Sequence, residues 1–278
     1  MAQEKPINQP IGIFDSGFGG LTILKEIKNL LPQYDYLYLG DNARAPYGSR
    51  SFESVYEYTL QCVDYLFKQN CSLVILACNT ASAKALRNIQ QKDLPLIAPN
   101  KRVLGVIRPT TEIIGNYSKT GHVGVLATTG TVSSESYLVE IEKFFPKLKV
   151  YQEACPMWVP LIENNEINNI GADYFIKKHC NNLMQKQPLI DTVILGCTHY
   201  PIIINKIKEY LPKNVNVLMQ GPIVANGVKD YLLRHPEIEI NCSKNNSVSF
   251  LTTDYPETFN KAASLFYTKP VIAQRIIF

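Results

Sequence analysis

Residues 74–82 read VILACNTAS, and residues 193–201 read VILGCTHYP. Each stretch places a cysteine after an apolar run that ends in a small residue, and a threonine follows within two positions. Short apolar runs rich in branched side chains are typical of strands that are buried on both faces of a sheet. We therefore expect Cys78 and Cys197 just beyond the ends of two buried strands.

Similar apolar runs recur along the chain, and helical patterns separate them. Segment 21–31, LTILKEIKNLL, repeats Leu and Ile at spacings of three and four and is followed by Pro32, which indicates an amphipathic helix with a stop. Segments 55–69 and 137–145 have comparable patterns. Strands that alternate with helices predict an α/β fold with mainly parallel sheets. The expected strands cover residues 11–14, 36–40, 73–77, 123–127, 192–196 and 215–219.

The order of these motifs is repeated. Segments 11–22, IGIFDSGFGGLT, and 123–134, VGVLATTGTVSS, each join an apolar run to a turn of Gly, Ser or Thr, and each precedes one cysteine stretch at a similar spacing. The repeat predicts two related, doubly wound domains: residues 1–100 with 210–278, and residues 101–209. Because ligands of open α/β sheets bind beyond the carboxyl ends of the strands, we expect the two thiols to approach one cleft between the domains.

Composition and charge limit the partners. The formal net charge is +4, and lysines and arginines are scattered, so we expect no nucleic-acid partner and no membrane-surface patch. No run approaches the ~20 apolar residues of a membrane span, and the polar N-terminus, MAQEKPINQP, does not resemble a signal peptide. Seven cysteines that do not cluster fit free thiols in a cytoplasmic protein.

The two repeated thiols have three conceivable uses. A disulfide does not suit a reducing compartment, and no ligand spacing around Cys197 and His199 supports a metal site, so we expect none. The third use is paired acid–base work, in which one thiolate removes a proton from one face of a carbon and the opposite thiol protonates the other face. A cysteine that serves only packing has no reason to recur in the same frame in both halves, so we favour this third use, which inverts a stereocentre.

Each thiol needs a polar neighbour that sets its protonation state. Asp15 ends the first expected strand and His199 lies two residues after Cys197, so each domain offers one candidate. The alternatives are an N-cap role for Asp15 and an ordinary loop position for His199.

The substrate cradle is expected at the strand ends. The turn at 15–20, DSGFGG, can present backbone N–H groups and Ser16 to an anion at a helix N-terminus. It fits the dinucleotide fingerprint badly, because Thr22 stands at the third glycine position, so a carboxylate is the better guest. Short polar residues after other strands and the loop at 40–51, GDNARAPYGSRS, should line the same cleft, although such residues are also common in turns. These residues are Asn79, Thr80, Thr128, Thr131 and Thr198, with Tyr47 and Gly48 in the loop.

Together these motifs resemble the glutamate racemases of the aspartate/glutamate racemase family. The resemblance runs from about Ile11 to Pro201 through IFDSGFGGLT, GDNARAPYGSRS, ACNTASA, TGTVSS, ACPMWVPLIE and LGCTHYP, in family order. It implies two α/β domains with the active site between them. It also implies a homodimeric enzyme that interconverts L- and D-glutamate without a cofactor and supplies D-glutamate for peptidoglycan synthesis.

The resemblance implies roles for individual residues. Cys78, assisted by Asp15, is the base toward D-glutamate, and Cys197, assisted by His199, is the base toward L-glutamate. A glutamate after ACPMWVPLIE also assists; Glu163 matches best, with Glu166 as the alternative. The positions that contact substrate in the family match Ser16, Tyr47, Gly48, Asn79, Thr80 and Thr198.

One segment departs from the family pattern. The family usually has Asp-Ser-Gly after the last strand, whereas residues 218–222 read LMQGP here. The departure concerns packing near the domain junction and a possible regulatory surface, and leaves the two thiols unaffected.

Three alternative functions stay open. The first is a racemase of the same two-cysteine class that acts on aspartate or a hydantoin. The second is a non-catalytic amino-acid receptor, which would keep the carboxylate-binding turn but has no need of paired thiols. The third is a pyridoxal-phosphate racemase, which needs a Schiff-base lysine; Lys84 follows ACNTASA, although we expect it on an exposed helix face.

Overall fold

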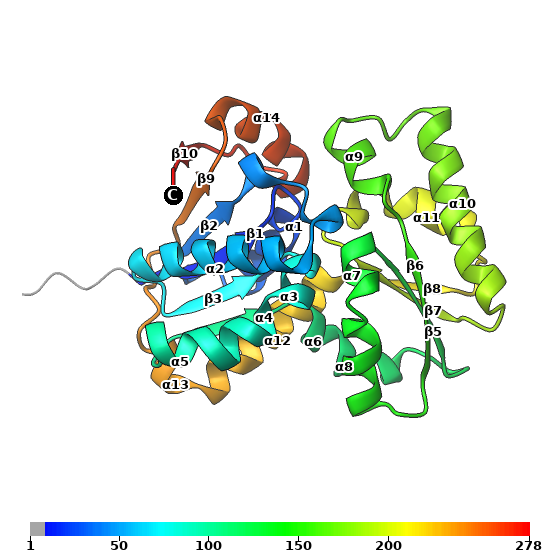
Figure 1. The fold of residues 1–278 in the computed structure, drawn as a ribbon, viewed down its shortest axis with the longest axis horizontal. Coiled ribbons are helices and arrows are strands. Elements are labelled where there is room, and N and C mark those ends of the chain that lie inside the picture. Colours follow the sequence, from blue (N-terminus) through cyan, green and yellow to red (C-terminus); the bar gives the residue numbers. More distant parts are fainter. Residues whose placement is uncertain (1–8) are drawn as a thin grey trace, which may run out of the picture.

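The computed structural model describes residues 9–278, which form two α/β domains side by side (Figure 1). The polar N-terminus through residue 8, for which the sequence argues against a signal peptide, lies outside the described residues. Both sheets are parallel throughout, so the expected fold class is confirmed. The six expected strands are all present, with ends that differ by one residue at most.

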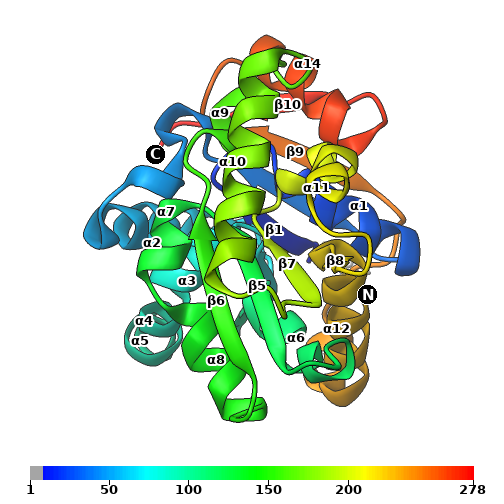
Figure 2. The same cartoon turned by 90° about the vertical axis from the view of Figure 1, so that its right-hand side faces the viewer.

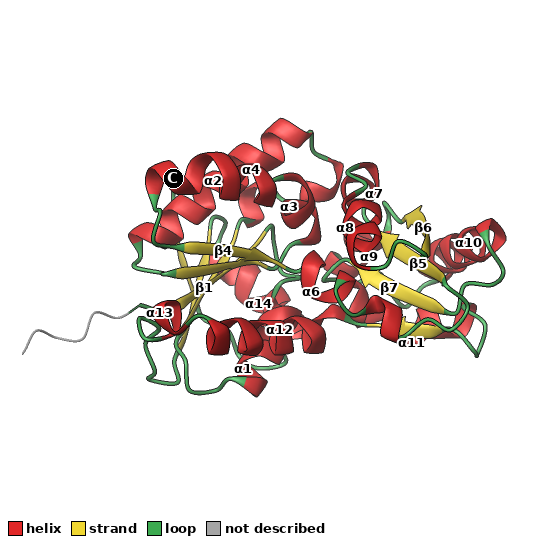
Figure 3. Cartoon of the chain, turned by 90° about the horizontal axis from the view of Figure 1, so that it is seen from below, coloured by secondary structure: helices red, strands yellow, loops and turns green. Residues whose placement is uncertain are grey.

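The first sheet has the strand order β10-β9-β2-β1-β3-β4. Its strands are β1 (Ile11–Asp15), β2 (Tyr36–Gly40), β3 (Leu73–Leu76), β4 (Arg102–Gly105), β9 (Val248–Thr252) and β10 (Ala273–Arg275). Helices cover both faces, as a doubly wound sheet requires. In Figure 3, α2 and α4 lie on one face, and α1 and α12 lie on the other.

The second sheet has the order β6-β5-β7-β8. Its strands are β5 (His122–Ala127), β6 (Lys149–Ala154), β7 (Thr192–Gly196) and β8 (Asn216–Leu218). Figure 2 shows α10 lying across one face of this sheet.

The three expected helical segments, 21–31, 55–69 and 137–145, correspond to α1, α2 and α8, whereas the long helices α10, α12 and α14 were not expected. The helices are α1 (Leu21–Leu30), α2 (Phe52–Lys68), α3 (Asn79–Lys84), α4 (Leu86–Asn88), α5 (Leu94–Ile97), α6 (Ile107–Thr111), α7 (Thr129–Ser133), α8 (Ser136–Phe144), α9 (Trp158–Glu163), α10 (Ile170–Lys186), α11 (Ile204–Tyr210), α12 (Gln220–Arg234), α13 (Pro236–Glu239) and α14 (Pro256–Tyr267).

Four strands were not expected from the sequence: β4, β6, β9 and β10. β4, β6 and β10 lie at sheet edges, where one side has no neighbouring strand and the residues stay partly exposed. Strand β6, KVYQEA, has mostly half-buried residues and lacks the continuous apolar run of a central strand.

Two of the strands lie on the other side of the expected domain boundaries. β4 pairs with β3 and extends the first sheet, whereas β8 pairs with β7 and extends the second. The repeat could not reveal this, because these strands lie outside the repeated motifs. We propose that the domain boundaries follow the sheets, with crossings after Gly105 and after Leu218.

The domains also share a core. One buried cluster contains Ile13 of β1, Leu195 of β7 and Val224 of α12. Burial of such side chains contributes roughly 1.5–3 kcal/mol each, so this shared cluster resists separation of the domains. The arrangement holds the carboxyl ends of both sheets toward the same space.

Candidate active site

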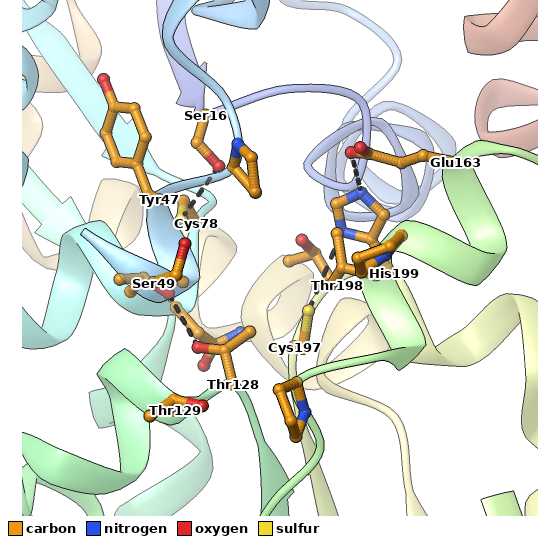
Figure 4. Close-up of a pocket in the computed structure, with 17 residues that line it drawn as sticks. Ser16, Tyr47, Ser49, Cys78, Thr128, Thr129, Glu163, Cys197, Thr198 and His199 are labelled. Atoms are coloured by element: carbon orange, nitrogen blue, oxygen red, sulfur yellow. Dashed lines mark hydrogen bonds and ion pairs between the residues drawn. The ribbon is translucent and has the colours of Figure 1, made fainter. Parts of the chain in front are cut away.

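A cavity of about 120 Å³ lies between the domains. Residues that follow the carboxyl ends of strands line it, including Ser16 after β1, Cys78 after β3, Thr128 after β5 and Cys197 after β7. It is smaller than the roughly 300–1,000 Å³ pockets that hold drug-sized ligands, so it suits a small metabolite. Figure 4 shows the sulfurs of Cys78 and Cys197 on opposite sides of this space.

Cys78 is held by the local chain geometry. The residue is extended and forms the N-cap of α3, where its Sγ accepts a hydrogen bond from the Ala81 N–H at 3.4 Å. The Ser16 Oγ lies 3.5 Å from the same sulfur. Burial raises the pKa of the Cys78 thiol to about 12, and the nearby Asp15 charge acts in the same direction, against the hydrogen bonds from Ser16 and Ala81. The thiol is therefore protonated at neutral pH and can donate a proton.

Asp15 acts on this thiol through its charge. Its carboxyl group is buried, and its Oδ2 accepts a hydrogen bond from the Gly17 N–H at 2.8 Å. Burial raises the pKa of Asp15, while the positive charge of His199 lowers it. The N-cap residue of α1 is Gly20, so the alternative N-cap role of Asp15 is not observed.

Cys197 has a different partner. His199 Nδ1 lies 3.8 Å from the Cys197 Sγ, and His199 Nε2 lies 2.9 Å from the Glu163 Oε1. Burial acts to lower the pKa of His199, but the hydrogen bonds to Cys197 and Glu163 outweigh it and raise the pKa to about 10. The imidazole is therefore a cation at neutral pH. A cation next to a cysteine stabilises the thiolate.

The position of Glu163 separates it from Glu166. Glu163 ends α9, lines the cavity and pairs with His199. Glu166 is exposed, does not line the cavity, and accepts a hydrogen bond from Asn169 at 2.5 Å. The geometry favours Glu163 as the assisting carboxylate.

The turn that follows β1 in the first domain packs against the loop that follows Cys197 in the second domain. A Cβ atom at Gly19 would lie 2.3 Å from the Thr198 Oγ1 and 2.4 Å from the His199 Nδ1. Such distances are far inside van der Waals contact, so only glycine permits this approach. The Thr22 hydroxyl donates to the Thr198 carbonyl oxygen at 3.0 Å across the same junction. His199 is thus fixed by residues of both domains.

Hydroxyl groups from both domains meet at another edge of the cavity. Thr80 Oγ1 lies 3.0 Å from Thr128 Oγ1 and 3.4 Å from Thr131 Oγ1. Thr80 and Thr128 line the cavity, whereas Thr131 supports them from behind. A Cβ at Gly48 would lie 3.0 Å from the Thr128 Cβ. The loop at 40–51 can therefore approach Thr128 closely because Gly48 has no side chain.

Tyr47 and Lys84 differ from simple expectations. Tyr47 lines the cavity, but its hydroxyl donates to Asp41 and points away from the two thiols (Figure 4). Lys84 is buried, and its Nζ donates to the Arg50 carbonyl oxygen at 2.7 Å. The expectation of an exposed Lys84 was therefore wrong, and Lys84 is not among the residues that line the cavity.

The structure brings nearly all the expected site residues together. Asp15 and Thr131 are the exceptions, since neither lines the cavity. The residues that line the cavity as expected are Ser16, Tyr47, Gly48, Cys78, Asn79, Thr80, Thr128, Glu163, Cys197, Thr198 and His199. Pro46 and Ser49 also line it and belong to the loop at 40–51, which was expected there. Lining residues that sequence reasoning missed are Thr129, Pro156, Val159 and Pro160. They lie in quoted motifs, but three of the four are apolar types that carry no chemical signal.

Among residues 9–278, no helix is long and apolar enough to cross a membrane. No group of three or more His, Cys, Asp or Glu side chains in this part of the chain could hold a metal ion.

Fold and site together define a class: a two-domain α/β protein whose two thiols face one small cavity, each with its own ionisable partner. Comparison with known proteins agrees. The profile of the Asp/Glu/Hydantoin racemase family matches residues 19–226, more than half of the chain. The chain belongs to this racemase family.

Individual relatives are similar over nearly their whole length. The glutamate racemase of Sulfurihydrogenibium sp. is 37% identical over 92% of this chain and 93% of its own. The crystal structure of a glutamate racemase from Bacillus anthracis has a TM-score of 0.88 and 31% identity, with 98% of each chain covered. A Francisella tularensis glutamate racemase, solved in complex with D-glutamate, has a TM-score of 0.86 and 32% identity, with 98% of each chain covered.

Proposed function

We propose that this protein is a glutamate racemase that uses Cys78 and Cys197 as its two acid–base groups. The observation that carries the proposal is the placement of these thiols on opposite sides of one cavity, each beside a different ionisable partner. A substrate carbon held between them exposes one face to each sulfur. Removal of its proton on one face and protonation on the other inverts the stereocentre.

The charges define a starting state for one direction. The His199 cation supports a Cys197 thiolate, and burial keeps Cys78 a neutral thiol. In this state Cys197 removes the α-proton of L-glutamate, and Cys78 donates its proton to the opposite face. The product is D-glutamate, and the enzyme is left with a Cys78 thiolate and a Cys197 thiol. This is the state that accepts D-glutamate for the reverse reaction.

The rest of the cavity suits an amino-acid zwitterion. Ser16, Thr80, Thr128 and Thr198 offer hydroxyl groups along its wall. Hydroxyls both donate and accept hydrogen bonds, so they can bind the carboxylates and the ammonium of glutamate. The names of the similar curated proteins support glutamate as the substrate.

The chemistry proposed needs no cofactor, because both proton transfers are made by the chain's own thiols. The cellular setting is part of the same proposal. All seven cysteines are free, which fits a cytoplasmic protein. We further propose a homodimer that supplies D-glutamate for peptidoglycan, as the family resemblance implies.

The deciding experiment follows optical rotation. Purified protein, free of cofactor and with reduced thiols, is incubated with L-glutamate and, in parallel, with L-aspartate. We expect rotation to decay to zero with glutamate alone. Decay with aspartate alone would move the protein to that specificity. No decay with either substrate, from folded protein, would contradict the racemase proposal and favour an amino-acid receptor.

A further inference from the structure

Three buried polar side chains form a closed ring of hydrogen bonds at the domain junction. The Asn79 Nδ2 donates to the Gln220 Oε1 at 2.7 Å. The Gln220 Nε2 donates to the Tyr137 hydroxyl at 2.9 Å, and that hydroxyl donates to the Asn79 Oδ1 at 2.8 Å. All three residues are at most 2% exposed. The racemisation chemistry described above does not involve Gln220 or Tyr137.

A backbone carbonyl sets the direction of the ring. The Gln220 Nε2 also donates to the Val106 carbonyl oxygen at 3.0 Å. A carbonyl can only accept, so the nitrogen of this amide must face Val106 and its oxygen must face Asn79. The Asn79 amide must then turn its nitrogen toward Gln220 and its oxygen toward Tyr137. Gln220 thereby fixes which end of the Asn79 side chain points where.

The ring joins the elements at which the chain changes domain. Asn79 opens α3 directly after Cys78, and Tyr137 lies on α8 of the second domain. Val106 follows β4 at the first crossing, and Gln220 opens α12 after β8 at the second. Figure 3 shows α6 between the two sheets, and α6 contacts α3, α8 and α12.

Asn79 connects the ring to the cavity. It lines the cavity next to Cys78. The Asn79 Nδ2 carries two hydrogens. Within residues 9–278 it donates only to the Gln220 Oε1. The second hydrogen can therefore serve a bound carboxylate, provided that the amide keeps its orientation. A reversed amide would present an oxygen to that anion and repel it.

We infer that Gln220 is a positioning residue for substrate binding: it holds the Asn79 amide in the orientation that accepts the carboxylate of the substrate. The inference rests on the proposed function for the identity of that substrate. It gives the glutamine of the LMQGP segment a role in affinity, because neither Leu nor Met at this position could hold both Asn79 and Val106.

The first test is Gln220→Met, which keeps most of the side-chain volume and removes all its hydrogen bonds. The matched control is Gln90→Met. Gln90 donates to the Val103 carbonyl oxygen at 2.7 Å on the same β4 segment, but it does not contact Asn79. Both variants lose a glutamine-to-carbonyl bond, so both should lower the melting temperature.

Only Gln220→Met should change affinity. We expect KM to rise about tenfold for both L- and D-glutamate, the scale of losing one buried, oriented hydrogen bond to a charged group. The value of kcat should change far less, because Asn79 transfers no proton. Tyr137→Phe, which removes one of the two contacts that hold Asn79, should raise KM by a smaller factor and guards against misfolding of the first variant.

Other outcomes would overturn the inference. An unchanged KM in folded Gln220→Met would show that Asn79 keeps its orientation without Gln220. A lower kcat at constant KM would show that Gln220 acts on the spacing of the thiols instead. An equal rise in KM for Gln90→Met would mean that general destabilisation, and not the orientation of Asn79, causes the rise.

A second readout does not depend on activity. In ¹⁵N NMR spectra, the Asn79 side-chain amide protons should exchange slowly with solvent in the unaltered protein and much faster in Gln220→Met. Fast exchange in both proteins would disprove the ring itself. A protein that shows the slow exchange but does not racemise glutamate would leave the ring intact and refute the proposed function instead.

Discussion

Cys78 and Cys197 occupy matching positions after β3 and β7, yet their surroundings differ in charge. Cys78 caps a helix and lies beside the Ser16 hydroxyl, with the Asp15 carboxyl behind it. Cys197 lies beside the His199 cation, which Glu163 holds from its other side. A duplicated frame has thus placed two identical thiols beside different ionisable partners, and burial raises the pKa of the Cys78 thiol.

In the proposed mechanism the two sides have complementary tasks. Cys197 takes the proton from one face of L-glutamate, and Cys78 donates a proton to the other face. Two thiols that exchange these roles only through the substrate invert its α-carbon.

Removal of either sulfur should abolish racemisation. Cys78→Ser and Cys197→Ser should each lower the rate by about a thousandfold or more, because serine is a far weaker acid–base group. In D₂O, Cys78→Ser should still exchange the α-proton of L-glutamate, and Cys197→Ser that of D-glutamate, as NMR can follow. Cys242→Ser changes a buried thiol whose Sγ donates to the Ile238 carbonyl oxygen, and it should stay active. Near-normal turnover of either site variant would refute the two-base assignment.

Gly19→Ala should separate the domains locally. The new Cβ would overlap Thr198 and His199, and displacement of His199 by about 1 Å can cost roughly a hundredfold in rate. Gly171→Ala is the control, because its new Cβ would meet only the Asn169 side chain, at 3.2 Å. The activities of the two variants are measured side by side. Full activity of Gly19→Ala would mean that the close contact is not needed for turnover.

Asp15→Asn and His199→Asn should each affect one direction more. The enantiomers have equal energy, so kcat/KM must stay equal in both directions, and the difference must appear in kcat and in isotope effects. We expect His199→Asn to lower kcat about ten- to a hundredfold and to enlarge the isotope effect with α-deuterated L-glutamate. Asp15→Asn should do so with D-glutamate. Equal effects in both directions would mean that these residues only position the substrate.

Glu163→Gln should lower the rate of proton transfer by Cys197 about tenfold, which is the scale of losing a hydrogen bond to a charged partner. Loss of the carboxylate lowers the pKa of His199 from about 10, so the alkaline limb of kcat/KM should move to lower pH. Glu166→Gln is the control and should leave the pH profile unchanged. A shift with Glu166→Gln instead would reverse the assignment of the assisting glutamate.

The charge on His199 also makes the stability of the fold depend on pH. Its pKa rises from 6.5 to about 10 on folding, so the folded protein holds a proton that the unfolded chain releases between these pH values. Its contribution is complete below pH 6.5 and is lost as pH rises toward 10. Urea unfolding at pH 7 and pH 9 should show a smaller decrease in the free energy of unfolding for His199→Asn than for the unaltered protein. Identical decreases would show that other groups cause the pH dependence.

The arrangement of central strands and thiols could be predicted from the sequence alone. Apolar runs with Cys78 and Cys197 at their ends predict two parallel sheets, because central strands are recognisable from their burial on both faces. The repeated order of motifs places both thiols at strand ends, where such sheets bind ligands. The edge strands β4, β6 and β10 escaped prediction, because half-buried strands lack that apolar signature.

Which side chains meet in the site is known only from the folded chain. Glu163 and Glu166 are close in sequence, but α9 turns only Glu163 toward His199. The need for glycine at position 19 and the role of Gln220 both depend on contacts across the domain junction. Such contacts join residues far apart in the chain, where neither spacing nor residue type carries a local signal. The orientation of each side chain, and with it the partner that each thiol contacts, is set where the two sheets face each other.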